Sequence, residues 1–138
     1  MARSEQLRLE VVSPERLLVN EDVDELQAPA VDGYLGVLPG HAPLLTELGS
    51  GVLSFKQGSL SRYIAVHEGV MEVRPDGVRV LASDAEWSDA VDVERARQEL
   101  DRAMARLTDR KIGDDVEKTE AALARAKARI EAHRRAAE

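Results

Sequence analysis

The chain has 138 residues, a formal net charge of -7, 43% hydrophobic residues and 33% charged residues, a balance typical of a globular domain rather than a disordered chain. Its negative charge and its 3% aromatic content argue against a nucleic-acid partner, because phosphate backbones would be repelled and few side chains could stack on bases. It has no cysteine, which excludes disulfides, thiol nucleophiles and cysteine-based zinc sites, and no run of about 18 apolar residues that would predict a membrane span.

Glycine and proline divide the chain near Glu86. All five prolines and all glycines except Gly113 precede this point, so residues 1–85 are expected to form strands and turns. The run "LRLEVV" near the N-terminus alternates apolar and polar residues, "RYIAVHEGVMEV" is rich in β-branched side chains, and "PDG" marks a turn between two such runs. Short strands at this spacing predict an antiparallel β-sandwich.

Residues 86–138 show helical periodicity instead. Apolar residues recur every three to four positions from Val93 to Leu107 and again from Val116 to Ile130, with "TDRKIGDD" between them. The pattern predicts an antiparallel two-helix hairpin that follows the sandwich. Both apolar stripes are rich in alanine, which contributes far less on burial than leucine, so we expect the hairpin to be weakly held.

The run "GVLPGHAPLL" at residues 36–45 concentrates turn-forming residues around a single histidine. A catalytic base would need an acid, a nucleophile or a substrate within reach, and none is close to His41 in the sequence. We therefore favour a histidine that stabilises a turn over a catalytic one. The three histidines, His41, His67 and His133, do not have metal-ligand spacing, so we predict neither catalytic residues nor a metal site.

This run, with Gly51 beyond it and the helical segment behind it, resembles the epsilon subunit of bacterial F-type ATP synthases over essentially the whole chain. The resemblance implies a non-catalytic subunit of the central stalk. Its sandwich, residues 1–85, would bind the gamma subunit and the c-ring, and its hairpin, residues 86–138, would be regulatory. It would lie at the cytoplasmic face of the bacterial plasma membrane and contact the membrane only through the complex.

The resemblance also places the c-ring contact near the glycine- and proline-rich loop. A loop fixed by such turns loses little entropy when it binds a partner. The candidate docking residues in this loop are Gly36, Pro39, Gly40, His41 and Pro43.

Nucleotide binding enters only through the resemblance, since the chain has no P-loop sequence. Some bacterial epsilon subunits bind ATP through an [IL]-D-x-x-R-A motif and arginines of the second helix. Here "VDVERA" matches this motif except that valine replaces isoleucine or leucine in the first position. The guanidinium groups of arginines can bind phosphate oxygens through two parallel hydrogen bonds. ATP is therefore a possible regulatory ligand, with no obligatory cofactor, and the candidate residues are Glu86, Val91, Asp92, Arg95, Ala96, Arg102, Arg125 and Arg129.

Simpler interpretations stay open. Asp92 could be only a helix N-cap, and the arginines could form an ordinary solvated face, which would leave a stalk subunit without nucleotide sensing. The basic segment from Arg125 to Arg135 could dock on the catalytic alpha and beta subunits in an inhibitory state.

Two alternatives from other classes make distinct predictions. An enzyme built on "PGHAP" would lose turnover in His41→Ala. A free-standing β-sandwich adaptor would not co-purify with the membrane ATPase.

Overall fold

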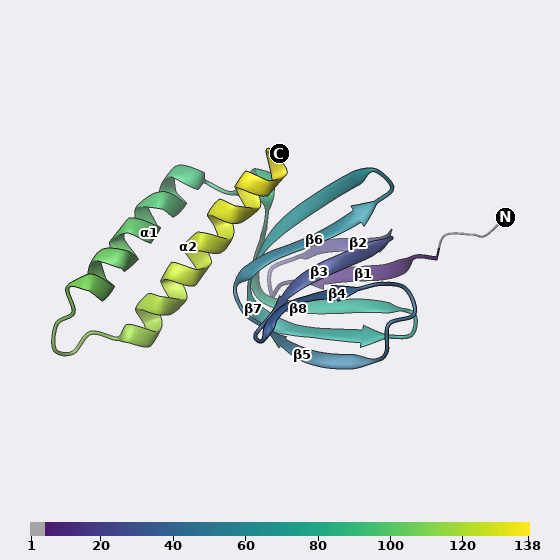
Figure 1. The fold of residues 1–138 in the computed structure, drawn as a ribbon, viewed down its shortest axis with the longest axis horizontal. Helices are drawn as coiled ribbons and strands as arrows, with labels where there is room; N and C mark the ends of the chain where they lie inside the picture. Colours follow the sequence, from purple (N-terminus) through teal and green to yellow (C-terminus); the bar gives the residue numbers. More distant parts are fainter. Residues whose placement is uncertain (1–4) are drawn as a thin grey trace.

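The computed structural model describes residues 5–138 and shows a β-sandwich followed by two helices (Figure 1). This confirms the predicted fold class. The strands are β1 (Leu7–Val12), β2 (Leu17–Val23), β3 (Glu25–Ala30), β4 (Gly33–Val37), β5 (Leu44–Leu48), β6 (Gly51–Gln57), β7 (Leu60–Arg74) and β8 (Gly77–Trp87). A short 3-10 turn (Ser88–Ala90) then leads to α1 (Val93–Thr108) and α2 (Val116–Ala136).

The sheet folds over on itself because its two longest strands pass through both layers. The hydrogen-bonded order is β2-β1-β8-β7-β5-β3-β4, and β6 pairs with β3 and β7. One half of β7 therefore pairs with β5 and the other half with β6. Pairing is antiparallel throughout, except that β1 lies parallel to β8.

The bend in β7 lies between these two halves. Glu68 has φ 57° and Gly69 has φ 155°, both unusual for a strand. A Cβ atom at Gly69 would lie 2.3 Å from the carbonyl oxygen of Leu81 on β8. Only glycine fits there, and this residue allows β7 to leave one layer and enter the other.

Alternation along the strands fills the space between the layers. Leu7, Leu9 and Val11 of β1 are at most 3% exposed, as the pattern "LRLEVV" predicts. On β7, Ile64 and Val66 join the same core. The neighbouring side chains of β7 point out of the opposite face, which carries α2.

Each helix of the hairpin begins after an aspartate that caps its N-terminus. Asp92 Oδ1 accepts a hydrogen bond from the backbone N–H of Arg95 at 3.1 Å, and Asp115 Oδ1 accepts one from Lys118 at 3.1 Å. Gly113, with φ 94°, lies in the connection between the helices. The first residues of both helices, Val93 and Val116, are those at which the predicted apolar stripes begin, whereas α2 continues to Ala136, beyond the end of its stripe at Ile130.

Only the second helix is packed closely on the sandwich. α2 lies along β6 and β7, while α1 packs on α2 away from the strands (Figure 1). The small apolar cluster under α2 contains Val52, Ala65 and Ala132, with Tyr63 at its edge. Within residues 5–138, neither helix is long and apolar enough to cross a membrane.

Candidate functional site at the junction of sandwich and hairpin

Glu86, near the end of β8, joins the sandwich to α2. Its Oε2 atom accepts a hydrogen bond from Arg129 Nε at 2.5 Å and another from His67 Nε2 at 3.1 Å. The hydrogen bond from His67 is the largest cause that lowers the pKa of Glu86 to about 2, and Arg129 lowers it further while burial opposes both. Glu86 is therefore a carboxylate at neutral pH, held between two donors from different elements.

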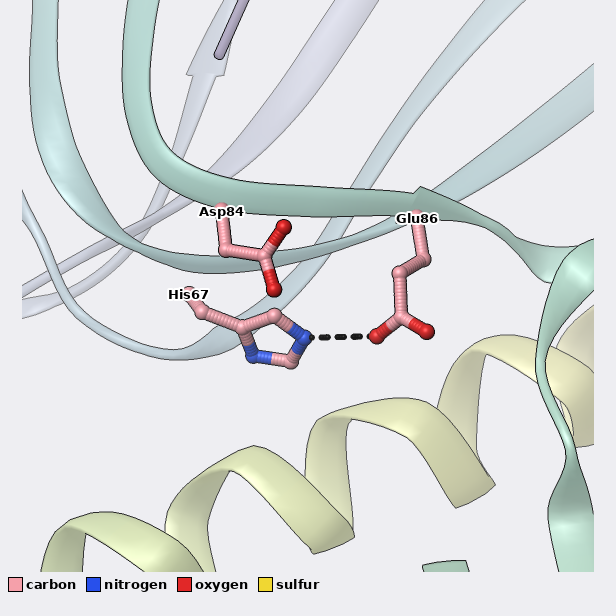
Figure 2. Close-up of side chains that lie close together, drawn as sticks. All are labelled: His67, Asp84 and Glu86. Atoms are coloured by element: carbon pink, nitrogen blue, oxygen red, sulfur yellow. Dashed lines mark hydrogen bonds and ion pairs between the residues drawn. The ribbon is translucent and has the colours of Figure 1, made fainter. Parts of the chain in front are cut away.

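Strand register brings His67 to this position. His67 lies opposite Asp84, and Ala65 lies opposite Glu86, so the three polar side chains project from one face of the paired strands. Figure 2 shows the imidazole directed at Glu86, with a helix running beneath it. His67 is 2% exposed. Its Nδ1 atom has no hydrogen-bond partner among residues 5–138.

The same three residues form a possible metal-ligand set. They offer one nitrogen and two carboxylate oxygens that all lie within 4.8 Å of one another, and zinc accepts such donors. In the docked hairpin, however, the Arg129 guanidinium is bonded to the same Glu86 oxygen, and Asp84 Oδ1 accepts the N–H of Ala85 at 2.9 Å. We therefore assign these groups to an ion-pair network that holds α2.

Further ion pairs extend this network along the hairpin. Arg125 Nη1 lies 3.7 Å from Glu68 Oε1 of β7. Glu99 of α1 lies between two arginines, with Oε2 at 3.9 Å from Arg129 Nη1 and Oε1 at 3.7 Å from Arg95 Nε. Charges of alternating sign thus run from β8 through α2 to α1.

The predicted nucleotide residues divide into three groups. Four of them line a hollow of about 310 Å³ between β8 and the helices, namely Glu86, Asp92, Arg95 and Arg129. Ala90 and Glu99 complete the lining of this hollow. Arg102 and Arg125 line a neighbouring groove of about 450 Å³ between α1 and α2. Val91 and Ala96 are 8% and 0% exposed, so they pack the base of α1 rather than face either hollow.

The predicted docking loop lies elsewhere on the sandwich. Gly36 belongs to β4, and Pro39, Gly40, His41 and Pro43 connect β4 to β5. The backbone N–H of His41 donates to Leu38 O at 3.1 Å, and the His41 Nδ1 atom lies 2.7 Å from the carbonyl oxygen of Ala42. These are turn contacts. Leu38, within the turn, is 58% exposed.

Comparison with known proteins agrees with this two-part architecture. The family description "ATP synthase, Delta/Epsilon chain, beta-sandwich domain" matches residues 6–88, and "ATP synthase, Delta/Epsilon chain, long alpha-helix domain" matches residues 89–134. The chain belongs to the ATP synthase delta/epsilon family. The two matches meet at the 3-10 turn between β8 and α1.

Curated relatives of this delta/epsilon chain cover nearly its whole length. It is 49% identical over 124 residues to the ATP synthase epsilon chain of Solibacter usitatus, a match that covers 90% of this chain and 92% of the relative. It is 46% identical over 127 residues to the epsilon chain of Moorella thermoacetica, which covers 91% and 95% of the two chains.

Solved structures confirm the fold. A chain in the Euglena gracilis mitochondrial ATP synthase (OSCP/F1/c-ring) superposes with a TM-score of 0.79 at 21% identity, covering 96% of this chain and 82% of that one. A chain in the Tetrahymena thermophila mitochondrial ATP synthase central stalk and c-ring gives a TM-score of 0.58 at 15% identity, covering 99% and 100%.

The sequence pattern of this family member assigned no role in the candidate site to His67, Glu68 or Glu99. The contact between His67 and Glu86 depends on the β7–β8 register, which no local pattern reveals. Glu68 reaches Arg125 only because β7 bends beside it. Glu99 was expected only as part of a solvated helix face with Arg95, and it does form an i, i+4 pair with Arg95.

Proposed function

We propose that this chain is a rotor subunit of the central stalk that couples ion translocation to ATP synthesis, and that it contains no catalytic group of its own. The observation that carries the proposal is the pairing of a β-sandwich with a helical hairpin in one chain of the delta/epsilon family. Within the complex the chain would be peripheral, at the cytoplasmic face of the bacterial plasma membrane. A rotor subunit needs firm docking surfaces, and the sandwich offers two.

The loop between β4 and β5 is the proposed c-ring contact. A backbone hydrogen bond from His41 N–H to Leu38 O closes its turn, and Gly40 adopts φ 83°. Leu38 in the loop and Leu45 at the start of β5 are 58% and 69% exposed. A preformed loop with exposed apolar side chains can bind a partner without first becoming ordered. His41 supports the turn in this proposal and carries out no chemistry.

The proposed gamma contact is a row of apolar side chains on the sandwich. Leu17, Val12, Leu81 and Val70 lie directly opposite one another across β2, β1, β8 and β7. Leu17 and Leu81 are 54% and 52% exposed. Continuous exposed apolar rows of this kind are typical of protein interfaces. The row lies on the half of β7 that pairs with β5, whereas the small apolar cluster under α2 includes Ala65 on the other half of β7.

The hairpin is proposed to act as a two-state brake on ATP hydrolysis. In the folded state α2 lies on the sandwich. In the released state its basic C-terminal part would contact acidic segments of the catalytic alpha and beta subunits. ATP bound across both helices would favour the folded state, provided that its affinity for that state is higher. The adjoining hollows that carry Arg95, Arg102, Arg125 and Arg129 support this assignment.

Reconstitution tests the stalk function. Membranes stripped of this subunit receive the purified chain, and co-purification, ATP-driven ion pumping and ATP hydrolysis are measured. We expect the chain to bind, restore coupling and reduce uncoupled hydrolysis, with Leu81→Glu weakening binding. A chain that neither binds nor changes pumping would exclude a rotor function and leave the free-standing adaptor.

Calorimetric titration tests the nucleotide part separately, with ATP in the presence and absence of Mg²⁺. We expect saturable binding to the wild type and its loss in Arg125→Ala/Arg129→Ala. Arg97→Ala is the matched control, because Arg97 is an exposed arginine of α1 that pairs with Glu94 and lines neither hollow. No binding at millimolar ATP would leave a stalk subunit without nucleotide sensing.

A further inference from the structure

An acidic side chain, Glu99 of α1, lies between Arg95 and Arg129 of the hairpin. Three hollows adjoin along the hairpin: about 310 Å³ beside β8, about 490 Å³ along α1, and about 450 Å³ between the helices. Glu99 lines all three, and no other residue does. Any ligand that spans these hollows must pass its carboxylate.

Glu99 is already bonded to cations that phosphate groups would use. Its two oxygens lie 3.7 Å from Arg95 Nε and 3.9 Å from Arg129 Nη1, which places it between arginines of different helices. The Glu99 side chain is 34% exposed, so its charge is only partly screened by water. Guanidinium groups bind carboxylate and phosphate oxygens in the same geometry, and one donor cannot fully serve both.

Other cations in the groove between the helices are not engaged in this way. Arg102, Arg106 and Lys118 line the groove, and within residues 5–138 none of the three makes an ion pair. Asp114 and Asp115 also line the groove, but their carboxylates accept hydrogen bonds from the backbone N–H groups of Lys111 and Lys118. The cations therefore attract phosphate groups into the groove, and Glu99 opposes them at its rim. The balance between these two contributions sets the affinity.

We propose that Glu99 is an internal competitor for nucleotide phosphates, occupying Arg95 and Arg129 in the folded hairpin and lowering the affinity of the site for polyphosphate ligands. This inference rests on the proposed nucleotide site. It assigns Arg106 and Lys118 to that site as additional phosphate-facing cations, and it makes the affinity depend on the charge of the ligand. Glu99 acts by competition and touches neither a reacting atom nor a required metal.

The test is Glu99→Gln in the full chain, titrated calorimetrically with ATP, ADP and adenosine. Removing one carboxylate beside a phosphate chain should tighten ATP binding about fivefold, the ratio that corresponds to about 1 kcal/mol for a partly exposed charge. The gain should be smaller for ADP and absent for adenosine. A merely structural effect of the substitution would shift all three ligands alike.

Glu120→Gln is the matched control. It removes the same charge from an exposed position of the hairpin that lines none of the three hollows, so ATP affinity should change less than twofold by long-range electrostatics alone. Circular dichroism of both variants verifies that the helices are intact.

The outcomes separate this inference from the function on which it rests. If the wild type binds ATP and Glu99→Gln binds it with the same affinity, the competitor role alone is overturned. Weaker binding of Mg²⁺-ATP by Glu99→Gln also overturns it, because Glu99 would then be a ligand of the nucleotide-bound metal. If neither protein binds ATP saturably, both the proposed nucleotide site and the competitor role are overturned.

Discussion

Neutralising Glu86 should loosen the hairpin at neutral pH but not in strong acid. In the docked structure, Arg129 and His67 both donate to the Glu86 carboxylate, whereas glutamine carries no charge for them to stabilise. The pKa of Glu86 is lowered from 4.5 to about 2. The ionised carboxylate therefore stabilises the folded chain above pH 4.5, and that stabilisation is lost as the pH falls from 4.5 towards 2.

The magnitude follows from the size of this pKa shift. A shift of about 2.5 units corresponds to about 3 kcal/mol. The Glu86 side chain is 26% exposed, so water screens part of the interaction, and we expect Glu86→Gln to cost about 2 kcal/mol at pH 7. With these pKa values, more than half of the difference between wild type and variant should be gone at pH 3.

Urea unfolding at pH 7, 5, 4 and 3 measures this difference. Circular dichroism follows the helices, and the fluorescence of Trp87 follows the junction, since Trp87 is next to Glu86 and its ring lies 4.1 Å from the guanidinium carbon of Arg62. Glu117→Gln, an exposed position in the first turn of α2, is the control and should stay within about 0.5 kcal/mol of wild type. A stability difference that stays constant from pH 7 to pH 3, or grows in acid, would refute the reasoning.

Two further substitutions probe the bend and the end of the hairpin. Gly69→Ala should lower the free energy of unfolding by about 3 kcal/mol, because φ is 155° and the new Cβ would meet Leu81 O at 2.3 Å. Gly36→Ala is the control, since Gly36 has open space around it, and it should cost under about 1 kcal/mol. Equal melting temperatures of the two variants would contradict the role of Gly69 in the bend. Arg135→Ala removes a guanidinium that lies 4.9 Å from the Tyr63 ring. Hydrogen exchange of the backbone amides in the last turn of α2 should become about threefold faster, which corresponds to about 0.5–1 kcal/mol. Unchanged exchange would show that this contact does not stabilise the end of α2.

Local patterns were enough to predict the elements of this fold. The alternation of Leu7, Leu9 and Val11 predicted a strand with one buried face, and the structure buries all three. Asp92 was anticipated as an N-cap and caps α1. These features depend on neighbours within a few residues, so one sequence contains the information.

The contacts between elements could not be predicted in the same way. His67 meets Glu86 because β7 and β8 pair in one register, and a shift of one residue would direct the imidazole into the core. The i, i+4 spacing of Glu99 from Arg95 predicts a surface ion pair, which the structure contains. That Glu99 also lines three adjoining hollows depends on how α1 packs beside α2 and β8, which the spacing does not reveal.

The composition of the interface suits the release of the hairpin that the proposed brake requires. The apolar contact under α2 is formed by small side chains, Ala65, Ala132 and Val52, and a buried methyl group contributes only about 0.8 kcal/mol. A leucine-rich interface would hold α2 more firmly but expose a large apolar patch on release. Here the Arg129–Glu86 and Arg125–Glu68 pairs fix the position of the helix, and water or an acidic partner can satisfy those charges once α2 leaves. Specific placement of α2 is therefore compatible with the release that the proposed brake requires.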